Sequence, residues 1–359
     1  MCKLEDSEFA DLKTGIIGPR GVGKSTVFHA LTGMPPLPGQ GDAKNRARLG
    51  QIKVADPRLD FLEATHGSKK KVPIELTVID FAPNPKEQKE GAALDPTLVP
   101  LIRDLDALLV VTPQFGLVRA PLLPSIESVE GELVFADFDQ AERRLERLKK
   151  EKGPVDFERN ALERCLKWLE AGKPLRTLEM TSQELQAFAS FGFVSRKPVL
   201  AVVNCDADAA ALDLPLGEGD ALHAREIEVF KLAANFESEL WELDTAGQSE
   251  LLAEAGLSAP ARDRLITTLY SALGLITFYT AGEPEAHAWP LRRGASALEA
   301  AGRIHSDIAR GFIRAEVVSY EDFAALRSDA KVKEAGKLRL EGRDYEMADG
   351  DIIHIRFKI

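Results

Sequence analysis

The stretch Gly18–Ser25 constrains this chain more than any other, because it matches the pattern G-x-x-x-x-G-K-[ST] at every fixed position. A short apolar run, Thr14–Ile17, precedes it, and a helical pattern from Thr26 to Leu31 follows it. Glycines let the backbone wrap phosphates closely, so that its N–H groups and the helix N-terminus face the anion. The order of strand, glycine loop and helix therefore predicts a binding site for a nucleoside triphosphate.

The motif also predicts individual roles. Lys24 brings a positive charge to the phosphates, and the Ser25 hydroxyl is the expected direct ligand of Mg²⁺, the predicted cofactor. Asp80 directly follows the apolar run Thr77–Ile79, where a second carboxylate could hold the metal through water; the alternative is an aspartate that caps a loop. Lys24 and Asp80 are thus the catalytic candidates. The predicted phosphate-binding residues are Arg20, Gly21, Val22, Gly23, Lys24, Ser25 and Thr26.

Recognition of the base is expected at the end of a later strand, where the run Leu200–Val203 leads to Asn204. A guanine-reading sequence would be N-K-x-D, whose aspartate pairs with two N–H donors of guanine. Here Ala207 stands at the fourth position and carries no acceptor, while Asp206 comes one residue early. Guanine specificity is therefore unsupported, and adenine is at least as well supported.

Two parts of a γ-phosphate switch are missing. No Ser or Thr occurs between Thr32 and Thr65, so the usual threonine of the first switch is absent. In the second switch, Pro83 takes the glycine position of D-x-x-G and has no N–H to offer. Water positioning would have to come from a backbone group, from Lys86 or Gln88, or from a partner. These changes leave binding intact but threaten hydrolysis or its coupling to movement.

Composition sets the broad class. With 359 residues, 45% hydrophobic and 29% charged, the chain has enough apolar content for two or three globular domains. No apolar run approaches the roughly 20 residues that span a bilayer, and the acidic start Met1–Asp6 does not resemble a signal, so we expect a cytoplasmic protein without membrane contact. The net charge of −11 argues against broad wrapping of nucleic acid. Cys2, Cys165 and Cys205 lack zinc spacing and are expected to be unpaired thiols.

The hydrophobic pattern predicts an α/β fold. Strand-like runs recur at Thr14–Ile17, Ile74–Ile79, Ala107–Val111 and Val199–Val203, separated by helices or loops, as in a parallel sheet flanked by helices. From Phe138 to Leu178 the apolar residues take helical spacing among many charges, with Gly153-Pro154 between two stretches, which predicts an inserted helical hairpin. The remaining segments predict a separate C-terminal α+β domain: strands at Ile276–Tyr279, Phe312–Val318 and Ile352–Phe357 around a helix at Ala297–His305.

With these features in place, the chain resembles the Obg-like ATPases, also called the YchF family of translation-factor-related P-loop NTPases. The resemblance spans nearly the whole length and is most specific in the following segments: Pro57–Asp60, Arg143–Leu148, Lys197–Leu200, Phe278–Gly282, Ala288-Trp289, Gly311–Val317, Lys333–Lys337 and Asp349–Asp351. It implies a Ras-like core with an inserted helical hairpin and a ubiquitin-like β-grasp domain, called TGS, at the C-terminus. The implied boundaries are 1–136 and 197–275 for the core, 137–196 for the hairpin and 276–359 for the TGS domain.

The resemblance also implies functional residues. The family accepts ATP as well as or better than GTP through an N-x-x-E element; Asn204 and Cys205 align with its start, while Ala207 replaces its glutamate. Ala233 and Ala234 match the loop that packs on the base. The family's second switch carries several glycines, of which only Gly91 remains here; the residues Pro83, Glu87, Ala93 and Asp95 take the other positions, as in a diverged branch.

Family members associate with ribosomes, and the resemblance implies contact through the hairpin and the TGS domain. The hairpin carries a basic cluster interleaved with acidic residues: Arg143, Arg144, Arg147, Lys149, Lys150 and Lys152. An ordinary solvated helix face is an equal interpretation. Trp289 and Phe312 could stack on RNA, although a core position is the stronger interpretation.

The function expected from the sequence is slow hydrolysis of ATP, or of GTP, on or near the ribosome. Two alternatives stay open. One is a nucleotide-binding adaptor with degenerate switches and little or no hydrolysis. The other is an Obg-type GTPase switch, which would bind GTP tightly and discriminate strongly against ATP.

Overall fold

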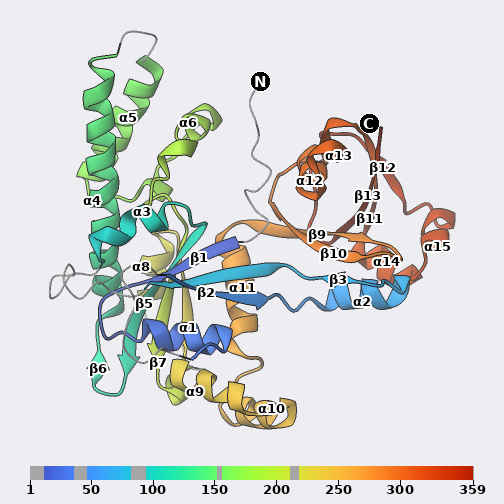
Figure 1. Cartoon of the computed structure of the whole chain (residues 1–359), viewed down its shortest axis with the longest axis horizontal. Helices are drawn as coiled ribbons and strands as arrows, with labels where there is room; N and C mark the ends of the chain where they lie inside the picture. Colours follow the sequence, from blue (N-terminus) through green and yellow to red (C-terminus); the bar gives the residue numbers. More distant parts are fainter. Residues whose placement is uncertain (1–11, 36–46, 82–93, 152–155, 211–217, 359) are drawn as a thin grey trace. The chain divides into compact units, whose positions relative to one another are not determined.

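The computed structural model describes residues 12–35, 47–81, 94–151, 156–210 and 218–358 (Figure 1). The chain divides into two compact units. The larger unit combines Lys13–Ile52 with Thr77–Thr268, and the smaller unit includes Lys53–Leu76 and Leu269–Ile359. Each unit therefore draws on segments that are far apart in the sequence.

A mainly buried sheet forms the centre of the larger unit. Its strand order is β2-β4-β1-β5-β7-β8, with β6 paired to the end of β5. Parallel pairing joins β1 to β5, β5 to β7 and β7 to β8. The strands are β1 (Leu12–Ile17), β2 (Ala47–Lys53), β4 (Glu75–Phe81), β5 (Ala107–Phe115), β6 (Val118–Arg119), β7 (Val199–Cys205) and β8 (Ile227–Leu232). All residues of β7 are buried, as expected for a parallel strand covered on both faces.

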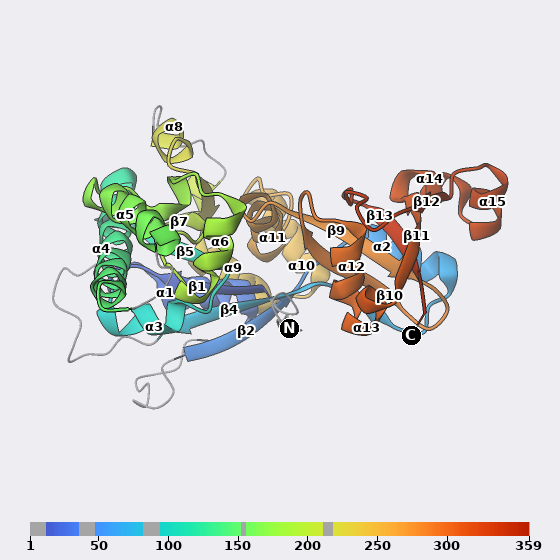
Figure 2. The same ribbon diagram turned by 90° about the horizontal axis from the view of Figure 1, so that it is seen from above.

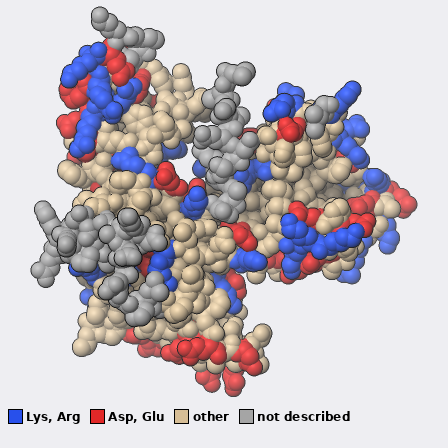
Figure 3. Space-filling view, in the orientation of Figure 1, with Lys and Arg blue, Asp and Glu red and all other residues tan. Residues whose placement is uncertain are grey.

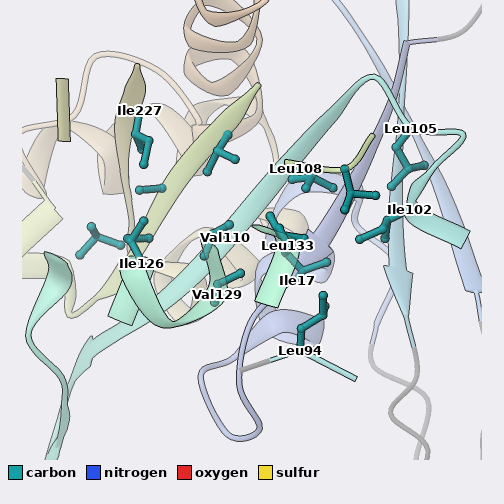
Figure 4. Packing of buried hydrophobic residues seen from close by; sticks show 14 of the residues in the cluster. Ile17, Leu94, Ile102, Leu105, Leu108, Val110, Ile126, Val129, Leu133 and Ile227 are labelled. Atoms are coloured by element: carbon teal, nitrogen blue, oxygen red, sulfur yellow. The ribbon is translucent and has the colours of Figure 1, made fainter. Parts of the chain in front are cut away.

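Helices bury their apolar sides on this sheet. Helix α1 (Lys24–Thr32) buries Val27 and Phe28 and packs beside α9 (Ala234–Glu239). On α4 (Leu122–Leu148), Val129 and Leu133 belong to the same buried cluster as Val110 of β5 (Figure 4). The other α-helices of the unit are α3 (Val99–Ile102), α5 (Asp156–Glu170), α6 (Ser182–Ala187), α7 (Ala207–Ala210), α8 (Glu218–His223) and α10 (Thr245–Glu254). Helix α11 (Ala261–Ala272) belongs to this unit up to Thr268 and to the smaller unit from Leu269.

The helical hairpin consists of α4 and α5, which lie side by side in Figures 1 and 2. The predicted start of the hairpin at residue 137 lies inside α4, which runs without interruption from Leu122 to Leu148. The first half of α4 packs on the sheet, and the second half packs on α5 through Ala141, Leu148 and Leu162. The buried face of α4 serves both surfaces; it is mainly apolar but includes the carboxylates of Glu130 and Asp137.

The smaller unit holds the second sheet, in the order β12-β11-β13-β9-β10-β3. Its strands are β3 (Lys71–Val72), β9 (Leu275–Ala281), β10 (Ala286–Arg292), β11 (Phe312–Ser319), β12 (Arg339–Glu341) and β13 (Asp351–Phe357). Its helices are α2 (Pro57–His66), α12 (Ala297–Ile304), α13 (Ser306–Arg310), α14 (Tyr320–Leu326) and α15 (Asp329–Glu334). The three strands and the helix predicted in this region are all present.

The segment 53–76 departs from the predicted boundaries, which placed it in the nucleotide-binding core. In the structure it belongs to the smaller unit. Strand β3 extends the second sheet beside β10, with Lys71 opposite Ala286. Leu59 and Leu62 of α2 are fully buried in one cluster with Tyr279. Burial of these apolar side chains explains why the segment packs as part of the smaller unit.

Candidate functional site

The loop between β1 and α1 requires glycine at two close approaches. Gly18 has a φ of 139°, and a Cβ there would lie 2.7 Å from the Val111 carbonyl oxygen. Gly23 has a φ of 91°, and a Cβ there would lie 2.3 Å from Nδ2 of Asn204. Both positions are strained for any larger residue. The glycines of the motif thus let the loop pass closely over β5 and β7.

The first turn of α1 presents backbone donors. The N–H of Val27 donates to the Gly23 carbonyl oxygen at 2.8 Å and opens the helical ladder. The N–H groups of Lys24, Ser25 and Thr26 precede this first bond. Together with the helix dipole, such groups form a site for an anion.

Lys24 lies inside the loop. Its Nζ donates to the carbonyl oxygens of Gly18 (2.8 Å) and Pro19 (2.6 Å). Burial lowers the pKa of Lys24 to about 8, while the nearby Asp80 carboxylate opposes this shift and Arg20 adds to it. A phosphate beside Nζ would favour the charged form of the lysine.

Asp80 is the penultimate residue of β4 and is 3% exposed. Burial raises its pKa, and the Ser25 hydroxyl, Arg48 and Lys24 oppose that shift. Oδ1 of Asp80 is buried without a hydrogen-bond partner among the described residues. A hydroxyl and a carboxylate with an open oxygen fit Mg²⁺, which accepts few protein ligands and keeps several waters. Asp80 therefore lies where the sequence predicted the metal carboxylate.

Asn204 joins three segments of the site. Its Nδ2 donates to the Val22 carbonyl oxygen at 3.1 Å, and its Oδ1 accepts from the Ala234 N–H at 3.3 Å. The side chain is buried, as are Ala233 and Ala234, so the loop before α9 can offer a ligand mainly its backbone. The predicted nucleotide-binding residues Asn204, Ala233 and Ala234 are thus brought together with the phosphate loop.

The side chain of Cys205 points in a different direction from that of Asn204. Its thiol is buried in the apolar cluster of the sheet, and burial raises its pKa. The side chain therefore lies in the core, and the prediction that Cys205 binds the nucleotide would have to be met by its backbone. Asp206 is turned toward the β5–β6 connection, where its carboxylate accepts from the Gly116 N–H at 3.0 Å and lies 3.5 Å from Arg119.

Sequence reasoning missed Arg48, which stands in β2 outside any motif. Its Nη1 lies 3.8 Å from Oδ2 of Asp80. Only the pairing of β2 beside β4 brings this side chain to the site.

Comparison with known proteins shows close relatives along the whole chain. The family model YchF-GTPase_C, described as "Protein of unknown function (DUF933)", matches residues 275–358. The "Ribosome-binding ATPase YchF" of Bacillus subtilis (strain 168) is 36% identical over 374 residues, which cover 97% of this chain and 100% of that protein. This chain belongs to the YchF family.

Further YchF proteins agree with this assignment. The protein of the same name from Haemophilus influenzae is 35% identical over 365 residues, covering 97% of this chain and 99% of its own length. The solved structure of the Schizosaccharomyces pombe YchF GTPase aligns with a TM-score of 0.79 and 26% identity, covering 96% of this chain and 97% of that one. The predicted family and the predicted fold class, an α/β core with a helical hairpin and a C-terminal α+β domain, are confirmed.

Several predictions made for this YchF chain fall outside the described residues. These concern Pro83, Lys86, Glu87, Gln88, Gly91 and Ala93 of the second switch, and residues 36–46 of the first switch. Lys152 and the Gly153-Pro154 turn of the hairpin also lie there. The predictions about the two switches therefore rest on the sequence alone.

The basic cluster of the hairpin is largely paired. Arg144 bonds to Glu158 at 2.7 Å, and Arg143 bonds to Asp139 at 2.9 Å. Lys149 bonds to Glu146 at 2.5 Å. Figure 3 shows Lys and Arg beside Asp and Glu on this part of the molecule. The surface is therefore mixed in charge rather than uniformly positive.

The two aromatic candidates of the C-terminal domain differ in burial. Phe312 is 8% exposed within the apolar cluster of the smaller unit. Trp289 packs partly against that cluster, and its Nε1 donates to the Thr280 hydroxyl at 3.0 Å. Phe312 therefore lies in the core, whereas Trp289 is only partly buried, and contact of either side chain with RNA stays a prediction.

No helix in the described ranges combines the length and the apolar content that crossing a membrane requires.

Proposed function

We propose that this chain is a cytoplasmic protein that binds ATP or GTP with Mg²⁺ at the loop Gly18–Ser25 and hydrolyses it slowly. The observation that carries the proposal is the convergence of three groups at one loop: the backbone N–H groups at the start of α1, the Lys24 ammonium and the Asp80 carboxylate. The names of the relatives, ribosome-binding ATPases, support the same activity.

Each residue has a task in this proposal. The backbone amides of residues 20–26 hold the phosphates, and Lys24 leaves its carbonyl partners to neutralise them. Ser25 would bind Mg²⁺ directly and Asp80 through water. The metal, when bound, supplies positive charge to the transferring phosphoryl group. Lys24 adds a second positive charge beside the same group.

The site gives no support to guanine specificity, so adenine is at least as well supported. Ala207 offers no acceptor at the position of the guanine-reading aspartate. Asp206 is already engaged by Gly116 and Arg119, so its carboxylate is held toward the β5–β6 connection. Asn204 fixes the position of the phosphate loop relative to the loop before α9, because its side chain bonds to both.

The proposed place of action is the ribosome, as the names of the relatives suggest. The hairpin α4–α5 and the TGS domain are the candidate contact surfaces. Because the hairpin charges are largely paired with one another, contact through it would rely on shape and hydrogen bonds as much as on net charge.

The test is a fluorescence titration with ATP and GTP in magnesium buffer, followed by single-turnover phosphate release. Lys24→Ala is the comparison variant, and Lys173→Ala, an exposed lysine of the hairpin region, is the matched control. We expect binding of ATP at least as tight as that of GTP, and phosphate release that Lys24→Ala abolishes. Absence of binding of either nucleotide would overturn the proposal.

Two other outcomes would select the alternatives. Nucleotide binding with phosphate release no faster than in Lys24→Ala would leave only an adaptor whose nucleotide is structural. Strong preference for GTP over ATP would indicate an Obg-type switch. Cosedimentation with ribosomes, with and without nucleotide, tests the proposed place of action.

A further inference from the structure

Arg48 is held in three directions beside the predicted metal carboxylate. Its Nη1 lies 3.8 Å from Oδ2 of Asp80. Its Nη2 donates to the carbonyl oxygens of Pro35 (2.8 Å) and Met34 (3.4 Å), just beyond the end of α1. Its guanidinium carbon stands 4.7 Å from the centre of the Phe28 ring. The position is thus defined by a ring, two carbonyls and a carboxylate.

This pair is sheltered from solvent. The Arg48 side chain is 18% exposed and that of Asp80 is 4% exposed, while Phe28 is fully buried. Charges in such surroundings are screened less by salt and water than charges on the surface. A planar guanidinium also suits the combination of ring stacking and hydrogen bonds better than a lysine would. The contact is therefore a built feature of the site and not a chance surface pairing.

We propose that Arg48 is a fixed positive charge that shares Asp80 with Mg²⁺ and makes nucleotide binding less dependent on the metal. This inference rests on the proposed function, because it concerns the same nucleotide site. Two effects act in the same direction. The guanidinium repels a second cation near Asp80, and this repulsion reduces the increase in nucleotide affinity that Mg²⁺ provides. It also attracts the phosphates, which strengthens binding when Mg²⁺ is absent.

The measured quantity is the ratio of two dissociation constants for a fluorescent ATP analogue, one in excess EDTA and one in excess Mg²⁺. Arg48→Met removes the charge but keeps a long side chain that can pack on Phe28. We expect this ratio to be about tenfold larger in Arg48→Met than in the wild type. Because the same ligand is used throughout, the effect of Mg²⁺ on the nucleotide's own charge cancels in the comparison.

Two variants make the test specific. Arg48→Lys keeps the charge and should hold the ratio near that of the wild type. Arg147→Met makes the same change of net charge on the exposed hairpin, where its Nε donates to the Arg143 carbonyl oxygen, and should leave the ratio unchanged. Circular dichroism and thermal unfolding show whether each variant is folded. Arg48→Gln serves for the same comparison if Arg48→Met does not fold.

An unchanged ratio in a folded Arg48→Met protein would overturn the inference while leaving the proposed function intact. An equal increase in Arg147→Met would also overturn it, because net charge rather than position would then be responsible. Failure of the wild type to bind in either buffer would contradict the proposed function itself, and the role of Arg48 with it.

Discussion

The side-chain amide of Asn204 donates to the Val22 carbonyl oxygen at 3.1 Å and so joins residues that are 182 positions apart. The same amide accepts from the Ala234 N–H at 3.3 Å. One buried side chain at the end of β7 therefore fixes the phosphate loop relative to the start of α9. In the proposed function, this geometry holds the phosphate and base regions of the site at a set distance.

Asn204→Ala should weaken both the fold and the site. The substitution leaves the Val22 carbonyl and the Ala234 N–H without this partner in a buried place, at a cost of about 1–3 kcal/mol in the free energy of unfolding. Nucleotide affinity should fall about tenfold or more, because the loop loses its support. Thermal unfolding and a nucleotide titration check these expectations. Asn160→Ala, at an exposed position of α5, is the matched control, and wild-type affinity in Asn204→Ala would contradict the role of the amide.

Gly23→Ala and Gly21→Ala separate backbone strain from steric clash. Both glycines have positive φ, 91° and 78°, so each alanine costs about 1 kcal/mol of strain. Only Gly23 meets a neighbour, because its Cβ would lie 2.3 Å from Nδ2 of Asn204, whereas a Cβ at Gly21 meets nothing within 4 Å. We expect Gly23→Ala to lower the unfolding midpoint clearly more than Gly21→Ala. Equal unfolding midpoints for the two variants would show that the steric clash with Asn204 does not contribute to the cost of Gly23→Ala.

Asp137 should make stability depend on pH. Burial raises its pKa to about 6, while donation from Ser195, through its side chain and its N–H, and from the Val194 N–H opposes the shift. A carboxyl whose pKa is higher in the folded state contributes stability that is present below pH about 4 and is lost as the pH rises through about 6. The loss amounts to about 3 kcal/mol in the free energy of unfolding.

The measurement compares the wild type with Asp137→Asn by urea unfolding across this pH range. The stability of the wild type relative to the variant should decline from pH about 4 to pH about 7, because only the wild type titrates at this position. Parallel pH profiles would show that the hydrogen bonds from Val194 and Ser195 outweigh burial.

Asp349 should anchor α2 to the C-terminal sheet within the smaller unit. Its Oδ2 accepts from Arg58 at 2.7 Å, and its Oδ1 accepts from the Thr277 N–H at 2.8 Å. Asp349→Ala removes both bonds and should lower the free energy of unfolding by about 1–3 kcal/mol. Asp344→Ala, an exposed carboxylate of the same unit, is the control for charge. Differential scanning calorimetry measures both, and equal effects would mean that Asp349 acts through charge alone.

The predicted strands of the core illustrate what local sequence can specify. Thr14–Ile17 and Val199–Val203 are apolar runs bounded by turn-forming or polar residues, and they became β1 and β7 with small extensions. The boundary predicted at residue 137 lies inside α4, whose buried face continues from the sheet cluster to the hairpin cluster, so the helix itself has no break there. A run of residues encodes its own conformation more clearly than the surface it packs on.

The sequence by itself determined the phosphate loop, the strand that carries Asp80, the order of elements and the kinship with YchF, because these depend on neighbouring residues and their spacing. Only the tertiary structure decided that Arg48 faces Asp80, that Asn204 supports Val22, and that residues 53–76 fold with the C-terminal sheet. These relationships join residues that are distant along the chain. They arise from strand pairing and burial, which no local pattern records.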